Sequence, residues 1–331
     1  MSTASNGSIQ VGFVGLGRMG LPMSCRLLDA GFDLMVHNRS QGKVQELAAR
    51  GARPAETLED ITRSSDLLLT CLPDIATVES LYMGKGGIIA NARRGQILVD
   101  HSTVGLATSK ACAAAAAERG ALFLDAPISG GSERAANGTL TIMAGGPVAA
   151  YEVALPLFNV MGATVRHIGP TGTGTAVKLV NQLLVGIHCV AAAEAMLLGA
   201  KAGADPALVY EVVSSGWGQS FILDRNAPVM LDRDFAGARA QLKLILKDLG
   251  LIQDMAQEVA APIPGGDLAY RMFRDAAEGG LSELDPAAIV LPLEEQAQLE
   301  EITTDAESLL GPKSSGVEEN RFEGGEDERS A

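Results

Sequence analysis

The stretch Val11-Gly-Phe-Val-Gly-Leu-Gly-Arg-Met-Gly20 decides the fold of this chain. It opens within a short apolar run, residues 10–14, and is followed by residues 22–29, in which apolar side chains recur at helical spacing before Gly31. This order predicts a β-strand, a tight glycine turn and an α-helix.

The turn, Gly15-Leu16-Gly17-Arg18-Met19-Gly20, follows the G-x-G-x-x-G pattern. Glycine is common, so the pattern alone is weak, but between a strand and a helix each glycine has a function. Gly15 permits the turn, Gly17 lets backbone amides approach a pyrophosphate, and Gly20 allows the helix to pack closely on the sheet. The helix N-terminus favours an anion. We predict a dinucleotide site at residues 15–20; the alternative is a structural turn that binds nothing.

Strand and helix signals alternate from this turn to residue 170. Strands are expected at 32–37, 67–72, 97–100, 122–125, 140–144 and 164–168, with helices between the early ones, including 109–119. Beyond residue 174 the pattern becomes helical, with a long helix expected at 175–202 and shorter ones at 206–214, 238–258 and 268–278. The predicted fold class is α/β: an N-terminal Rossmann domain with a doubly wound parallel sheet, then an all-helical C-terminal domain.

Four segments are expected along the chain. Residues 1–8 are small and polar, without the features of a secretory signal, and are interpreted as a disordered leader. Residues 9–169 form the dinucleotide-binding domain, and residues 170–293 form a helical substrate and oligomerisation domain that begins with a long interdomain helix. Residues 294–331 contain 12 acidic and 3 basic residues and are interpreted as an acidic, disordered tail.

Composition excludes several classes of protein. With 26 basic and 40 acidic residues the formal net charge is −14, which argues against nucleic acid as a partner. No apolar run reaches the roughly 20 residues of a membrane helix, so no membrane insertion is expected. The four cysteines are dispersed in apolar stretches, as reduced packed thiols are, and the histidines lack metal-ligand spacing. We expect a cytoplasmic protein with no metal site.

The end of the second predicted strand selects the cofactor. An acidic residue there would accept hydrogen bonds from a ribose, but this chain has His37-Asn38-Arg39-Ser40. Arg39 can pair with a 2′-phosphate or stack on adenine, and Ser40 can donate a hydrogen bond. Asn38, Arg39 and Ser40 therefore predict NADP in preference to NAD; the alternative is that Arg39 is an ordinary solvated residue.

Three further blocks carry candidate chemistry: Asp100-His-Ser-Thr103, Asp125-Ala-Pro-Ile-Ser-Gly-Gly131 and Gly172-x-Gly-x-x-x-Lys178-x-x-Asn181. With the glycine turn, they resemble the β-hydroxyacid dehydrogenase family over residues 9–293. This family includes 3-hydroxyisobutyrate dehydrogenase, tartronate semialdehyde reductase and L-threonate dehydrogenase. Gln182 stands where many hydroxyisobutyrate enzymes have asparagine, which favours the tartronate semialdehyde and threonate branches. The resemblance implies an NAD(P)-dependent enzyme of the EC 1.1.1 type, acting on a short 3-hydroxy acid or its semialdehyde, and a homodimer or homotetramer.

The residues of these blocks suit that chemistry. Backbone amides at Gly130 and Gly131, beside the Ser129 hydroxyl, form a concave donor array that can hold a small carboxylate substrate. Lys178 and Asn181 lie on one face of the predicted long helix. Hydride transfer to a carbonyl leaves an oxygen that gains negative charge and needs a proton, so Lys178 is the candidate general acid/base, with Asn181 orienting Lys178 or the substrate. The alternative is a surface lysine.

The resemblance implies further contacts. It places Ser102 and Thr103 near the nicotinamide, Leu72 and Pro73 near the adenosine half, and Lys247 close to both cofactor and substrate. Trp217 and Phe221 are interpreted either as pocket lining or as core.

Other functions remain open. The first alternative is a reductase or dehydrogenase of the succinic semialdehyde, glyoxylate or L-threonate type on the same scaffold, and imine reduction is disfavoured by the presence of Lys178. The second is a non-catalytic NADP-binding interaction protein.

Overall fold

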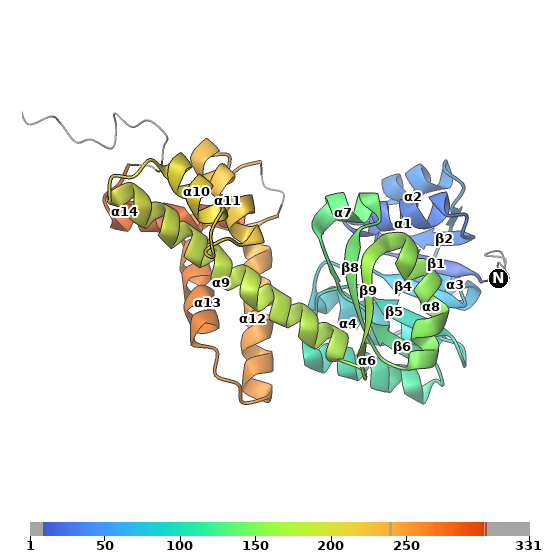
Figure 1. Ribbon diagram of the computed structural model, residues 1–331. Coiled ribbons are helices and arrows are strands. Elements are labelled where there is room, and N and C mark those ends of the chain that lie inside the picture. Colours follow the sequence, from blue (N-terminus) through green and yellow to red (C-terminus); the bar gives the residue numbers. More distant parts are fainter. Residues whose placement is uncertain (1–8, 238–239, 301, 303–331) are drawn as a thin grey trace, which may run out of the picture.

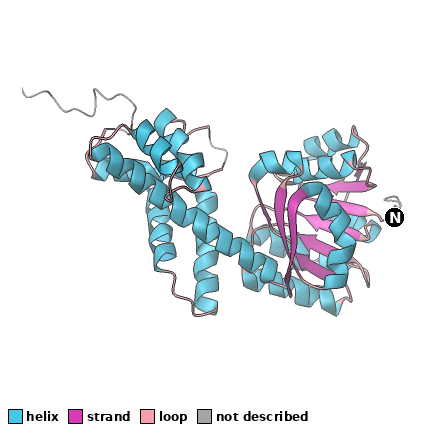
Figure 2. Cartoon of the chain, viewed as in Figure 1, coloured by secondary structure: helices cyan, strands magenta, loops and turns pink. Residues whose placement is uncertain are grey.

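A long helix, α9 (Thr173–Lys201), joins two bodies in the computed structural model, which describes residues 9–237, 240–300 and 302 (Figure 1). One body is built on a β-sheet covered by helices, and the other consists of helices alone (Figure 2). The predicted fold class, a Rossmann domain followed by a helical domain, is confirmed.

The sheet is ordered β3-β2-β1-β4-β5-β6-β8-β7, with β9 also paired to β8. Its strands are β1 (Val11–Val14), β2 (Leu34–His37), β3 (Arg53–Pro54), β4 (Leu67–Thr70), β5 (Ile97–Asp100), β6 (Leu122–Asp125), β7 (Ile128–Ser129), β8 (Leu140–Gly145) and β9 (Gly162–Gly169). Strands β1 to β6 run parallel, as β8 and β9 do, whereas β8 is antiparallel to β6 and β7. The chain reverses its direction of winding between β1 and β4, the place where open sheets of this kind bind ligands.

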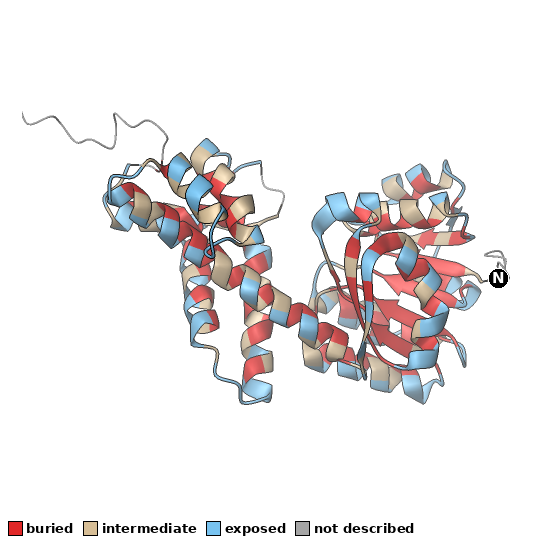
Figure 3. Cartoon of the chain, in the orientation of Figure 1, coloured by how far each residue is buried: buried red, intermediate tan, exposed pale blue. Residues whose placement is uncertain are grey.

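Both faces of the sheet are buried. Leu67 and Leu69 of β4 face one apolar cluster and Leu68 faces the other, because successive side chains of a strand alternate. Figure 3 shows the central strands as continuously buried. The covering helices are α1 (Gly20–Asp29), α2 (Gln41–Ala48), α3 (Leu58–Ser64), α4 (Ile75–Met83), α5 (Ile88–Asn91), α6 (Leu106–Glu118), α7 (Gly131–Asn137) and α8 (Val148–Met161).

The second body packs around α9. Its helices are α10 (Pro206–Ser214), α11 (Phe221–Asp232), α12 (Leu242–Glu258), α13 (Pro264–Ala276) and α14 (Leu291–Gln296), with a short 3-10 segment at Pro286–Val290. Leu179 and Met196 of α9 share a core with Leu249 of α12 and Phe273 of α13. Among the described residues α9 is also the one helix that is long and apolar enough, by length and composition alone, to cross a membrane. Its role in this core explains that composition.

Most predicted elements are present. The long helix spans 29 residues, close to the prediction, whereas the predicted helix at 238–258 is assigned from Leu242, with residues 238–239 outside the described residues. Helix α11 was not predicted, since Pro228 inside it is a helix-stop signal. The two-residue strands β3 and β7 are too short to show an alternating pattern.

The ends of the chain are described only in part. The predicted leader, residues 1–8, and most of the predicted tail, residues 301 and 303–331, lie outside the described residues. The structured chain extends past residue 294, where the tail was expected to begin. Glu294 lies in α14, is buried, pairs with Arg233 and accepts a hydrogen bond from the Ile302 amide at 2.8 Å.

Candidate active site

The glycine turn follows β1 and leads into α1. Gly15 has φ +95°, and a Cβ there would meet the Cys71 carbonyl oxygen at the end of β4. A Cβ on Gly20 would meet the Gly15 carbonyl oxygen, whereas one on Gly17 would have no atom within 4 Å. The backbone therefore needs glycine at positions 15 and 20, while position 17 borders open space. This fits a close approach by a pyrophosphate.

Asn38 ties the loop after β2 to this turn. Its Oδ1 accepts a hydrogen bond from the Leu16 amide at 3.0 Å, and its Nδ2 donates to the Ser40 hydroxyl at 2.9 Å. Arg39 is exposed beside them and, among the described residues, has no ion-pair partner. The three residues predicted to select the cofactor thus lie beside the glycine turn, with the Arg39 guanidinium available to a ligand.

The loops after β4 and β5 are joined by hydrogen bonds. The Leu72 amide donates to the Ser102 hydroxyl at 2.8 Å, and that hydroxyl donates to Asp100 Oδ1 at 2.6 Å. Asp100 also accepts from Thr70, and burial raises the pKa of its carboxyl. Leu72 and Ser102 are thereby held at the carboxyl ends of neighbouring strands, with Pro73 exposed beside Leu72. This is the edge of the sheet at which Rossmann folds bind dinucleotides.

Lys178 lies in a buried hydrogen-bond cluster on α9. Its Nζ donates to Gln182 Oε1 at 2.9 Å, and Asn181 Nδ2 donates to the same oxygen at 2.9 Å. Gln182 Nε2 in turn donates to Asp248 Oδ2 of α12 at 2.5 Å. Burial lowers the pKa of Lys178 to about 8; the nearby Asp248 carboxylate opposes this effect and Lys247 adds to it.

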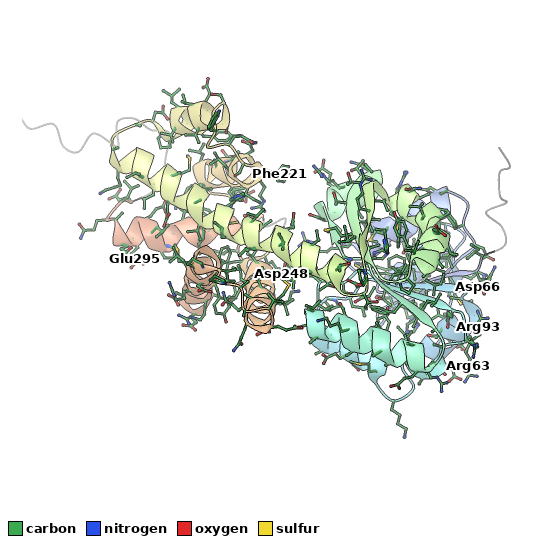
Figure 4. All side chains as sticks on the ribbon, turned by 60° about the horizontal axis from the view of Figure 1, so that its bottom comes forward. Arg63, Asp66, Arg93, Phe221, Asp248 and Glu295 are labelled. Atoms are coloured by element: carbon green, nitrogen blue, oxygen red, sulfur yellow. The ribbon has the colours of Figure 1, made fainter. Side chains whose placement is uncertain are left out.

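Lys247 joins this cluster to the sheet. Its Nζ donates to the Thr103 carbonyl oxygen at 3.0 Å, a contact across 144 residues of sequence. The same Nζ lies 2.9 Å from Asp248 Oδ1, without the geometry of a hydrogen bond. Figure 4 shows Asp248 on the side of the helical body that faces the sheet. The structure therefore brings together Thr103, Lys247, Lys178 and Asn181.

The Ser129 loop stands at the end of β7. Gly130 and Gly131 have φ +133° and +72°, values that favour glycine, and both are exposed at the start of α7. Within the described part of the chain no side-chain hydrogen bond links Ser129, Gly130 or Gly131 to the Lys178 cluster. The predicted carboxylate anchor thus comes from β7 and the start of α7 and the predicted acid/base from α9, with no such hydrogen bond between them in the described part of the chain.

Phe221 and Trp217 do not belong to a core. Trp217 is fully exposed, and Phe221 is 70% exposed at the start of α11. The guanidinium of Arg134 on α7 lies 5.7 Å from the centre of the Phe221 ring, which brings α11 next to the helix that follows the Ser129 loop. Figure 4 also places Phe221 on the side facing the sheet. Phe221 therefore lies close to the predicted anchor.

Two residues of the Lys178 cluster, Gln182 and Asp248, are not among the site residues predicted from the sequence. Gln182 was noted only as a departure from other family members, although its spacing of four from Lys178 puts both on one helix face. Asp248 was not singled out, and its position next to Lys247 was the only local sign. Its contact with Gln182 spans 66 residues of sequence.

Two family models cover most of the described chain. Residues 10–169 match the model for the NAD binding domain of 6-phosphogluconate dehydrogenase. Residues 172–293 match the model for the NAD-binding domain of NADP-dependent 3-hydroxyisobutyrate dehydrogenase.

Known proteins resemble the chain over nearly their whole length. It is 36% identical to 2-(hydroxymethyl)glutarate dehydrogenase of Eubacterium barkeri, covering 86% of this chain and 94% of that one. It is also 36% identical to 2-hydroxy-3-oxopropionate reductase of Escherichia coli, covering 86% and 97%. The crystal structure of 3-hydroxyisobutyrate dehydrogenase from Salmonella typhimurium superposes with a TM-score of 0.78 at 31% identity, covering 86% of this chain and all of that one.

Proposed function

This chain belongs to the β-hydroxyacid dehydrogenase family, and we propose that it oxidises a short 3-hydroxy acid, or reduces the corresponding semialdehyde, with NAD(P). The expected substrates are of the 3-hydroxyisobutyrate or tartronate semialdehyde type. The observation that carries the proposal is the buried Lys178 ammonium, held by Gln182, with a pKa lowered to about 8. A proton donor is most effective when its pKa lies near the working pH.

Lys178 acts in this proposal as the general acid/base. In reduction it donates a proton to the oxygen that gains negative charge, and in oxidation it removes the proton from the hydroxyl. Asn181, whose Nδ2 is held by the same Gln182 oxygen, orients the substrate next to Lys178. The Ser129 hydroxyl and the amides of Gly130 and Gly131 hold the substrate carboxylate. Acceleration then comes mainly from positioning and charge stabilisation.

The proposed NAD(P) site combines residues that follow β1, β2, β4 and β5 with Lys247 of α12. The open space at Gly17, and the positions at Gly15 and Gly20 where a Cβ would collide, fit the pyrophosphate of such a cofactor. The proposed contacts are Gly15, Leu16, Gly17, Arg18, Met19, Gly20, Asn38, Arg39, Ser40, Leu72, Pro73, Ser102, Thr103 and Lys247. The bound nicotinamide supplies or accepts the hydride. Arg39, exposed and without an ion-pair partner among the described residues, favours NADP over NAD.

We further propose that the helical body, residues 170–293, forms a homodimer or homotetramer. Val177, Val180 and Leu184 are exposed on one face of α9. Such an apolar stripe is typical of a protein interface. Light scattering of the purified protein tests this state. A cytoplasmic location is part of the same proposal.

The experiment that tests the function is a spectrophotometric screen with NADPH, NADP, NADH and NAD. Substrates include tartronate semialdehyde, glyoxylate, succinic semialdehyde, 3-hydroxyisobutyrate, glycerate, threonate and 2-(hydroxymethyl)glutarate. Turnover of a hydroxy acid or its semialdehyde supports the proposal. Which of these substrates are turned over then distinguishes the candidate substrate types. Cofactor binding with no turnover of any substrate would instead support the non-catalytic interaction protein.

A further inference from the structure

Resting on the proposed function, we infer that Asp248 is a positioning residue: acting through Gln182, it fixes the direction of the hydrogen bonds that hold Lys178 and Asn181. Lys178, Gln182 and Asp248 are 7%, 8% and 6% exposed, so little water is available to replace a lost partner.

The Gln182 amide lies between two groups of opposite hydrogen-bond character. A lysine ammonium can only donate, and an ionised carboxylate can only accept. The amide therefore satisfies both neighbours in one orientation only, with Oε1 toward Lys178 and Nε2 toward Asp248, as the structure has it. In this orientation Oε1 also accepts from Asn181, so a single oxygen positions both residues proposed to face the substrate.

Asp248 is held at this place by the packing of α12 on α9. One turn after Gln182, a Cβ on Gly186 would lie 2.7 Å from the Leu249 side chain. The two helices therefore pack tightly against each other next to the contact between Gln182 and Asp248. Lys178, Asn181 and Gln182 all lie on α9, whereas Asp248 lies on α12. A residue of a second helix therefore sets the direction of the hydrogen bonds among these three side chains.

Replacing the carboxylate by an amide removes this constraint. In Asp248→Asn the new side chain can donate as well as accept, so the Gln182 amide can turn and place Nε2 against the Lys178 ammonium. Two donors then face each other, and Lys178 and Asn181 lose their shared acceptor. The charged groups that act on Lys178 are Asp248 and Lys247, both on α12. Removal of the Asp248 charge leaves Lys247 unopposed, so both effects lower the pKa of Lys178.

The test compares wild type with Asp248→Asn, Asp248→Glu and Asp254→Asn. Asp254 is exposed on the same helix, so its variant is the matched control. In Asp248→Asn we expect the pH at which kcat/KM for reduction declines to fall by about half a unit or more. We also expect kcat to drop about tenfold, as for one lost hydrogen bond, with a smaller change in KM. Asp248→Glu, which keeps the carboxylate, restores the wild-type pH profile, and Asp254→Asn leaves it unmoved.

Two additions make the test independent of folding defects and of turnover: a further variant, Gln182→Met, and a measurement of the Lys178 titration by NMR. Gln182→Met removes the connecting amide, so adding Asp248→Asn to it has a smaller effect on kcat than in wild type. Carbon-13 lysine NMR follows the titration of Lys178, whose signal is absent from Lys178→Met. A downward shift of this titration in Asp248→Asn supports the inference even if no substrate is turned over, in which case the proposed function alone fails. An unmoved titration in a folded Asp248→Asn variant, or an equal shift in Asp254→Asn, overturns the inference.

Discussion

Asp125, the last residue of β6, accepts a hydrogen bond from the backbone amide of Thr175 in the first turn of α9, at 2.8 Å. The other carboxylate oxygen accepts from the Gly172 amide at 2.7 Å. Asp125 therefore caps the helix that carries Lys178. Lys178 follows Thr175 by three residues, so the cap connects the sheet to the proposed acid/base.

Asp125→Ala removes the acceptor for two buried backbone amides. We expect a loss of about 1–3 kcal/mol in the free energy of unfolding, measured by urea denaturation. Turnover should fall as well, because the start of α9 is no longer held against β6. Asp125→Asn keeps one acceptor oxygen and should lose less stability than alanine. Equal stability of wild type and Asp125→Ala would contradict this account of the cap.

Lys178→Met tests the acid/base assignment directly. Because methionine fills a similar volume but carries no proton, we expect NADPH binding to persist while kcat falls by about 10²–10⁴. Binding is measured by fluorescence titration and turnover by steady-state kinetics. Lys201→Met, at the exposed end of the same helix, is the control and should keep wild-type turnover. Near-normal activity of Lys178→Met would remove Lys178 from the mechanism.

The pH dependence should have opposite signs in the two directions. Reduction needs Lys178 in its charged form, so kcat/KM stays level at low pH and declines as the pH rises through the lowered pKa of about 8. Oxidation needs the neutral amine, so kcat/KM rises with pH through the same range. Profiles for both directions, measured on one substrate pair, check this. A profile for reduction that stays level to pH 10 would be incompatible with a proton donor of this pKa.

Arg39→Ala tests the choice of cofactor. If the exposed guanidinium pairs with the 2′-phosphate, the KM for NADPH should rise about tenfold to a hundredfold, with little change for NADH. Arg63→Ala removes the same charge from an exposed position on α3, where Arg63 pairs with Glu59, and serves as the control. The position of Arg63 is marked in Figure 4. Equal effects of Arg39→Ala on both cofactors would refute the preference for NADP.

Gly17→Ala and Gly15→Ala should separate binding from folding. The new Cβ at position 17 meets no protein atom within 4 Å, so the stability of Gly17→Ala should stay near wild type. NADPH binding should be lost, because the new methyl group occupies the space proposed for the pyrophosphate. Gly15→Ala should also destabilise the fold, because φ is +95° and the Cβ meets the Cys71 carbonyl oxygen. Thermal unfolding and fluorescence titration measure the two effects. Undiminished NADPH binding by Gly17→Ala would contradict the proposed site.

The sequence by itself determined the elements and their class. The glycine turn, the strand at 97–100 and the long helix could be predicted because φ preferences and apolar periodicity act between residues that are close along the chain. It also identified the family, since four motifs occur in the right order. Helix α11 was not predicted because a proline inside a helix, here Pro228, is unfavourable for local helix formation and is tolerated only in the folded protein.

Only the tertiary structure decided which side chains surround Lys178. Gln182 meets Asp248 across 66 residues, Lys247 meets Thr103 across 144, and Asp125 meets Thr175 across 50. No periodic pattern in the sequence predicts such contacts. They depend on how α9, α12 and the sheet pack together rather than on residues that are neighbours along the chain. Packing also buries the Lys178 ammonium and lowers its pKa to about 8, a property set by surroundings that no local pattern encodes.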